Sequence, residues 1–139
     1  MNPIVELQNI TFTYPHAASP ALGDISLSLN PGDFALLMGP SGCGKTTLME
    51  TLAGVVPNAT GGRIRGKALV NGVDVPRSDD KQRGTVGLVL QDPEAQLTNL
   101  YVEDEIAFGL ENLGLPREVI RERLEEVLRY ARLLPLRHS

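Results

Sequence analysis

A glycine-rich stretch in the first half of the chain has the residue types and the spacing of a phosphate-binding loop. It reads Gly39-Pro40-Ser41-Gly42-Cys43-Gly44-Lys45-Thr46-Thr47 and fits the pattern G-x-x-x-x-G-K-[ST]. Its glycines let backbone N–H groups come close to phosphate oxygens, and Lys45 brings a mobile positive charge to the β- and γ-phosphates. The Thr46 hydroxyl is suited to bind Mg²⁺. The stretch therefore predicts binding of a nucleoside triphosphate, and the alternative is a glycine-rich turn without a ligand.

Such a loop needs a buried strand before it and a helix after it. Residues 34–38 form a short apolar run that is typical of a buried parallel strand. Residues 47–53 read as a helix that begins near Lys45 and ends before Gly54. The positive end of that helix's dipole would point at the bound phosphates. Strand, loop and helix thus follow one another in the order that phosphate binding requires.

Further strands are expected on both sides of this unit. Apolar and polar residues alternate at 10–14 and again at 25–30, which predicts two half-buried strands in an antiparallel layer. After the helix, residues 63–70 read as another strand. Asn71-Gly72 is typical of a tight hairpin turn, and residues 73–75 would form the returning strand.

Two side chains outside the loop have positions that suit a nucleotide site. Tyr14 closes a strand upstream of the loop, where it is either a core aromatic or a face on which adenine stacks. The apolar run at 86–90 predicts a second parallel core strand, and Gln91 follows it at the sheet edge where ligands bind. Gln91 would reach Mg²⁺ or the attacking water there, unless it is an ordinary polar residue at a strand end.

Two helices are expected in the last third of the chain. Residues 103–113 place several apolar side chains on one face, and Gly114 ends this helix. The next helix starts at Pro116 and carries an apolar stripe formed by Ile120, Leu124, Val127, Ala131 and Leu134. Its many charged residues form a solvated face or, alternatively, a docking surface. We assign no function to the charged loop at 79–83.

Composition and charge indicate a soluble cytoplasmic protein with at most one domain. The chain has 139 residues, 42% of them hydrophobic, a net charge of −4 and a single cysteine, Cys43. The acidic balance argues against extended nucleic-acid binding, although a local basic patch is compatible with it. One cysteine excludes an internal disulfide framework. No apolar run approaches the length of a membrane span, and the N-terminus is no signal peptide.

Four motifs together resemble the first half of the ATPase subunit of an ATP-binding-cassette (ABC) transporter, most of all the energy-coupling-factor type of importer. Phe12-Thr13-Tyr14-Pro15 resembles the A-loop, whose aromatic residue stacks on adenine, and the stretch 39–47 matches the Walker A motif. Residues 88–97 resemble the Q-loop, with Gln91 as its glutamine. Residues 102–109 and the helices after them resemble the family's helical subdomain.

The resemblance implies an α/β P-loop NTPase fold that is incomplete in this chain. It would comprise an N-terminal antiparallel β layer and part of the parallel core sheet at about 1–97, and the start of the helical subdomain at about 98–139. ATP and Mg²⁺ would be the cofactors, held by Tyr14, the loop residues and Gln91. Two such subunits would form a homo- or heterodimer on the inner face of the membrane. A transmembrane subunit, which imports a vitamin or a metal ion, would dock near Gln91 to Leu97.

Three motifs that the family requires are absent from the 139 residues. They are the LSGGQ-type signature, the Walker B strand that ends in Asp-Glu, and the switch histidine, whose place His138 does not take. We therefore expect a truncated chain that binds ATP weakly at best, does not hydrolyse it alone, and self-associates or is marginally stable. The main alternative is a non-catalytic nucleotide-binding or interaction module. A small P-loop kinase and a DNA-repair relative of the same superfamily fit the sequence less well.

Overall fold

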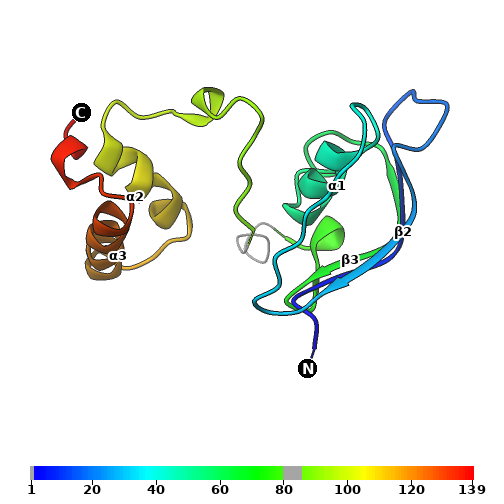
Figure 1. Ribbon diagram of the computed structural model, residues 1–139, viewed down its shortest axis with the longest axis horizontal. Coiled ribbons are helices and arrows are strands. Elements are labelled where there is room, and N and C mark those ends of the chain that lie inside the picture. Colours follow the sequence, from blue (N-terminus) through cyan, green and yellow to red (C-terminus); the bar gives the residue numbers. More distant parts are fainter. Residues whose placement is uncertain (1, 80–85) are drawn as a thin grey trace. The chain divides into compact units, whose positions relative to one another are not determined.

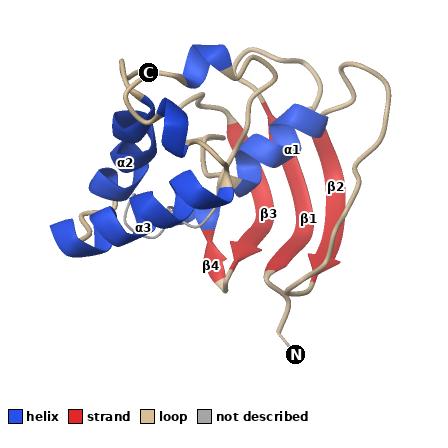
Figure 2. Ribbon diagram, turned by 60° about the vertical axis from the view of Figure 1, so that its left-hand side comes forward, coloured by secondary structure: helices blue, strands red, loops and turns tan. Residues whose placement is uncertain are grey.

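An antiparallel sheet forms the framework of the first of two compact units, residues 1–88, in this computed structural model, which describes residues 2–79 and 86–139. Its strands are β1 (Val5–Thr13), β2 (Leu22–Leu29), β3 (Arg63–Val70) and β4 (Val73–Asp74). They lie in the order β2-β1-β3-β4, and every neighbouring pair is antiparallel. Figure 1 labels β2 and β3 of this sheet, and Figure 2 shows all four strands in this order. The predicted antiparallel layer of the first two strands is confirmed.

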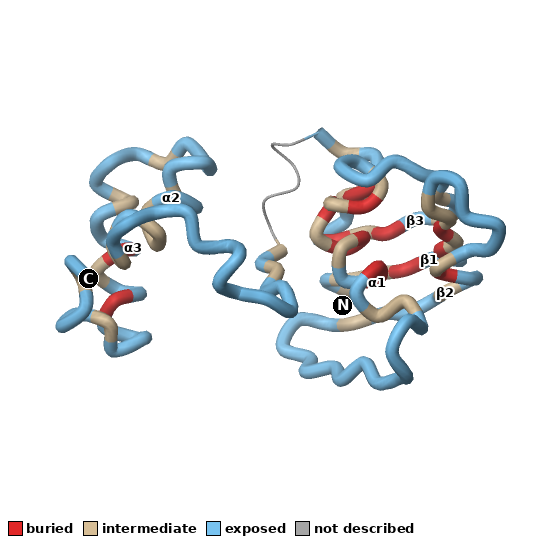
Figure 3. The backbone as a smooth tube through the Cα atoms, turned by 90° about the horizontal axis from the view of Figure 1, so that it is seen from above, coloured by how far each residue is buried: buried red, intermediate tan, exposed pale blue. Residues whose placement is uncertain are grey.

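The core of this unit lies between one face of the sheet and helix α1 (Lys45–Leu52), which crosses that face (Figure 2). Ile10 and Phe12 of β1 are fully buried, and Leu48 and Leu52 of α1 pack against them in the same cluster. Alternation along β1 sends its even-numbered apolar residues inward after the bulge between Leu7 and Ile10. Figure 3 shows the buried positions gathered on β1, β3 and α1.

Two turns form as their residue types predict. α1 ends in a Schellman motif, in which Gly54 has φ 77° and the Val55 N–H donates to the Glu50 carbonyl at 2.9 Å. Between β3 and β4, Asn71 and Gly72 have φ values of 49° and 78°, the left-handed pair that a two-residue hairpin turn needs. The returning strand is shorter than predicted, because Val75 already begins the 3₁₀ helix η1 (Val75–Arg77).

The two predicted parallel core strands are not strands in the structure. Residues 34–38 and 86–90 have no regular secondary structure, and Phe34 and Met38 are 95% and 78% exposed. An apolar run becomes a strand only beside another strand that takes its backbone hydrogen bonds, and no described strand pairs with either run. The charged loop at 79–83 lies, apart from Asp79, outside the described residues.

The second unit, residues 89–139, is helical. It contains η2 (Glu94–Gln96), α2 (Val102–Asn112), α3 (Arg117–Tyr130) and η3 (Leu134–Leu136). Both predicted helices are confirmed, and Gly114 follows α2 with φ 66°. The predicted stripe on α3 is partly wrong, because the buried residues are Leu124 and Leu128, whereas Val127 is 41% exposed. Leu124 and Leu128 are four residues apart and lie on the same side of α3, which packs against α2. Leu128 rather than Val127 is therefore inside.

Within the described residues, no helix has the length and apolar character needed to cross a bilayer.

Candidate functional site

The glycine-rich loop adopts a conformation that only glycine accommodates at its turning points. Gly42 and Gly44 have φ values of 80° and 97°. A Cβ atom on Gly44 would lie 2.5 Å from the Ala21 carbonyl oxygen, and one on Gly39 would lie 2.7 Å from Cys43 Sγ. The loop is therefore packed against the residue before β2 so closely at Gly44 that a side chain is excluded there.

The Lys45 ammonium lies over this loop. Its Nζ donates to the carbonyl oxygens of Gly39 and Pro40, both at 2.8 Å, and lies 3.5 Å from Cys43 Sγ. Carbonyl groups orient the ammonium without neutralising it, and no described carboxylate forms an ion pair with it. The loop thus holds a full positive charge at its rim, which suits a phosphate ligand.

The first turn of α1 adds further donors at the same place. Gly44 is its N-cap, no side chain caps it, and its first turn carries no acidic residue. The backbone N–H groups there keep their positive partial charge for an incoming anion. Thr46 is exposed in this turn. A hydroxyl oxygen is a ligand that Mg²⁺ accepts beside waters and phosphate oxygens, and the predicted role of Thr46 as such a ligand stays a prediction.

Thr47 and Tyr14 join the loop's helix to the end of β1. The Tyr14 hydroxyl and Thr47 Oγ1 are 3.1 Å apart, and the Tyr14 ring meets Phe12 edge to face at 4.8 Å between centroids. Thr47 is buried, and its carbonyl accepts the Thr51 hydroxyl at 2.7 Å. Tyr14 therefore packs against the core beside the loop. Its predicted role as a platform for adenine stays a prediction.

Gln91 is exposed and belongs to the second unit, in the segment that leads to η2. Its predicted contact with Mg²⁺ or the attacking water stays a prediction. No group of three or more His, Cys, Asp or Glu side chains that could hold a metal ion occurs in residues 2–79 and 86–139.

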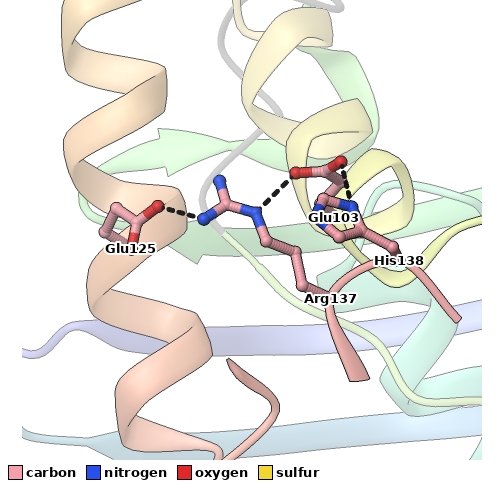
Figure 4. A network of polar contacts seen from close by, with 4 residues as sticks. All are labelled: Glu103, Glu125, Arg137 and His138. Carbon is pink, nitrogen blue, oxygen red and sulfur yellow. Dashed lines mark hydrogen bonds and ion pairs between the residues drawn. The ribbon is translucent and has the colours of Figure 1, made fainter. Parts of the chain in front are cut away.

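Sequence reasoning missed a polar network in the second unit (Figure 4). Arg137 donates to Glu103 of α2 at 2.7 Å and to Glu125 of α3 at 2.5 Å, and His138 Nδ1 lies 3.0 Å from Glu103. The hydrogen bond from Arg137, with the nearby charges of His138 and Arg137, holds the pKa of Glu103 below its ordinary value. Glu103 and Glu125, which accept its hydrogen bonds, raise the pKa of Arg137. Because the partners are up to 35 residues apart, no local pattern could have shown the network.

The glycine conformations, the oriented lysine and the uncapped helix define a P-loop nucleotide-binding protein. The sequence model of the family described as "ABC transporter" matches residues 22–139. The chain belongs to this family and forms part of an ABC transporter ATP-binding domain.

Curated relatives agree with this family. The chain is 44% identical over 135 residues to a putative ABC transporter ATP-binding protein of Methanosarcina mazei, covering 96% of this chain and 23% of the relative. It is 42% identical over 138 residues to the energy-coupling factor transporter ATP-binding protein EcfA1 of Enterococcus faecalis, covering 96% of this chain and 47% of the relative. The chain thus spans less than half the length of these relatives.

Solved structures show the same fold. The cbiO1 protein of Clostridium perfringens, described as part of the ABC transporter complex cbiONQ, matches with a TM-score of 0.80 and 25% identity over 100% of this chain and 54% of its own. A dimeric ATP-binding cassette in a post-hydrolysis state, bound to ADP and Pi, matches with a TM-score of 0.76 and 25% identity over 97% and 60% of the two chains. The partial P-loop NTPase fold of ABC ATPases is therefore shown.

Proposed function

We propose that this chain forms the ATP-binding part of the ATPase subunit of an energy-coupling-factor type importer. The observation that carries the proposal is the Lys45 ammonium, held by two loop carbonyls beside an uncapped helix N-terminus. The similarity to EcfA1 and to cbiO1 supports the importer type. The transported substrate would then be a vitamin or a metal ion, taken up by other subunits.

The loop's chemistry toward ATP follows from its parts. Backbone N–H groups of the loop and the first turn of α1 would donate to phosphate oxygens, and Lys45 would leave its carbonyl partners for the β- and γ-phosphates. Thr46 would bind Mg²⁺, which supplies charge neutralisation between the phosphates. Tyr14 would carry the adenine ring, and Gln91 would approach Mg²⁺ or the attacking water.

Binding with two ligands separates these roles. Lys45→Ala should weaken binding of both Mg-ATP and Mg-tripolyphosphate, because it removes the phosphate contact that the two ligands share. Tyr14→Ala should weaken the affinity for ATP about tenfold, which corresponds to the loss of one stacked base. The affinity for tripolyphosphate should not change. Isothermal titration calorimetry measures the affinities of both ligands for the unmodified chain and for the two variants. Equal losses for both ligands in Tyr14→Ala would show that Tyr14 acts through folding rather than stacking.

These residues alone are not expected to hydrolyse ATP. Hydrolysis requires a group that positions and polarises water beside the γ-phosphate, and the Walker B carboxylates that do so in the family are absent from the sequence. We expect the isolated 139-residue chain to bind ATP without turnover. A steady ATPase rate that disappears in Lys45→Ala would contradict this expectation.

An apolar cavity in the second unit supports docking of a membrane-embedded partner near the predicted Q-loop. It has a volume of about 430 Å³ and is lined by residues that include Leu97, Leu100, Tyr101 and Ile106. Leu100 is 89% exposed at its rim. Leu100→Ser should reduce copurification with the transmembrane subunit while leaving ATP affinity unchanged. Unchanged copurification would remove this surface from the proposal.

A further inference from the structure

The outer face of the sheet carries a small group of polar residues that the nucleotide site does not use. Side chains alternate along a strand, so Arg63 and Arg65 of β3 point to the same face. The register places Arg63 opposite Thr13 and Arg65 opposite Thr11 on β1. Thr11 and Thr13 flank the buried Phe12, so all four side chains lie on the face away from α1.

These four residues and Pro20 line a cavity of about 250 Å³. Two strands form its floor, and Pro20, in the segment before β2, forms one side. Thr11 Oγ1 accepts the Asp24 N–H at 3.0 Å, so the hydroxyl's own proton is available for a ligand. The cavity therefore combines two guanidinium groups with a hydroxyl donor on a rigid sheet.

The charge of the two arginines is not compensated within the part of the chain that the structure describes. The side chains of Arg63 and Arg65 have no hydrogen bond and no ion pair there. Two carboxylates of the neighbouring strands already accept amide donors, Glu6 from Gln8 at 2.8 Å and Asp24 from Asn9 at 2.8 Å. A local positive site thus exists on a chain whose net charge is −4.

We propose that this cavity binds a phosphate-type oxyanion, either a free phosphate compound or the phosphate of an anionic lipid headgroup. Guanidinium groups donate two parallel hydrogen bonds to phosphate oxygens, and a neighbouring hydroxyl adds a third donor. The site lies on the face of the sheet opposite the core that supports the P-loop, so it is a second site and does not depend on ATP binding.

Inorganic phosphate is the first probe, in a Lys45→Ala background so that the P-loop does not bind it. Titration followed by NMR should give saturable shifts of the amide signals of Thr11, Thr13 and Arg65. Arg65→Gln should weaken the affinity about tenfold, as expected for one lost charge-assisted contact. Lys67→Gln is the matched control, because it removes the same charge from the next outward position of β3 and Lys67 does not line the cavity. It should change the affinity by less than about twofold.

Vesicles of phosphatidylglycerol, compared with phosphatidylcholine, form the second arm. Saturable phosphate binding that depends on Arg65 assigns a free phosphate compound, and vesicle binding with the same dependence assigns a lipid headgroup. The proposal is overturned if neither probe binds, or if Arg65→Gln and Lys67→Gln weaken binding equally, which indicates unspecific attraction to a basic strand. Circular dichroism melts establish that both exposed substitutions leave the fold intact.

Discussion

Gly44 has the most restricted position in the phosphate-binding loop, and Gly42 offers a matched comparison. Both have positive φ, but a Cβ atom on Gly44 would overlap the Ala21 carbonyl oxygen, whereas one on Gly42 would meet nothing within 4 Å. Gly42→Ala should cost only backbone strain, about 1–2 kcal/mol. Gly44→Ala should cost more and also displace the loop from β2. Denaturant melts and ATP titrations measure both effects, and equal losses in the two variants would contradict the contact with Ala21.

The hydrogen bond between the hydroxyl groups of Tyr14 and Thr47 leads to a second prediction about single residues. Tyr14→Phe keeps the ring on Phe12 and removes the 3.1 Å hydrogen bond. It should lower the free energy of unfolding by about 0.5–1.5 kcal/mol, with ATP affinity retained. In a double-mutant cycle with Thr47→Val, the second substitution should add little to the first. Full additivity would show that the two hydroxyls act independently.

The phosphate-binding loop could be predicted because its residues form one short pattern. Contacts between residues far apart in the sequence could not be predicted. Lys45 and its glycines form a contiguous motif, so their role could be read directly. The Tyr14–Thr47 bond joins residues 33 positions apart, and only the fold brings them together. The cavity of Arg63 and Arg65 was missed for the same reason, because its threonines come from another strand.

At the scale of elements, the network around Arg137 holds the end of the chain to α2 and α3. Arg137→Ala should lower the melting temperature of the helical unit, and it should do so less at high salt, because both ion pairs are partly exposed. Arg123→Ala, an exposed charge on α3 without a described partner, is the control. A loss no larger than that of the control would show that the network contributes nothing to stability.

The same network predicts a pH dependence. The pKa of Glu103 is lowered from its ordinary value of 4.5, chiefly by the hydrogen bond from Arg137. Its contribution to stability is therefore complete above pH 4.5 and is lost as the pH falls below that value. Glu105, whose pKa is lowered by Asn99 and Thr98, acts in the same direction. Glu103→Gln should reduce, but not abolish, the fall in melting temperature at acid pH. An unchanged dependence of the melting temperature on pH would show that other groups cause this fall.

Elements with local signals were predicted well, and those that need a distant partner were not. The hairpin of β3 and β4 follows from Asn71-Gly72, and α2 follows from its spacing and Gly114. Residues 34–38 and 86–90 carry the composition of core strands, but a strand also requires a neighbour, and none is present in the described residues. On α3, the choice between Val127 and Leu128 depended on where α2 lies.

At the scale of the whole molecule, the apolar run before the loop is expected to determine whether the chain self-associates. Phe34, Leu36 and Met38 are largely exposed in the structure. Exposed apolar segments of this kind promote association, so the isolated chain should self-associate as its concentration rises. Light scattering tests this, with Phe34→Ser and Met38→Ser together as the comparison. A strictly monomeric chain with a sharp two-state melt would count against it.

Binding of ATP by the loop around Lys45 is tested most directly by a thermal melt of the chain with and without Mg-ATP. Ligand at about 100 times its dissociation constant should stabilise the chain by about 2.7 kcal/mol. We expect Mg-ATP to raise the melting temperature of the unmodified chain and to leave that of Lys45→Ala unchanged. A folded chain whose melting temperature does not change with Mg-ATP, or rises equally in both, would contradict the claim.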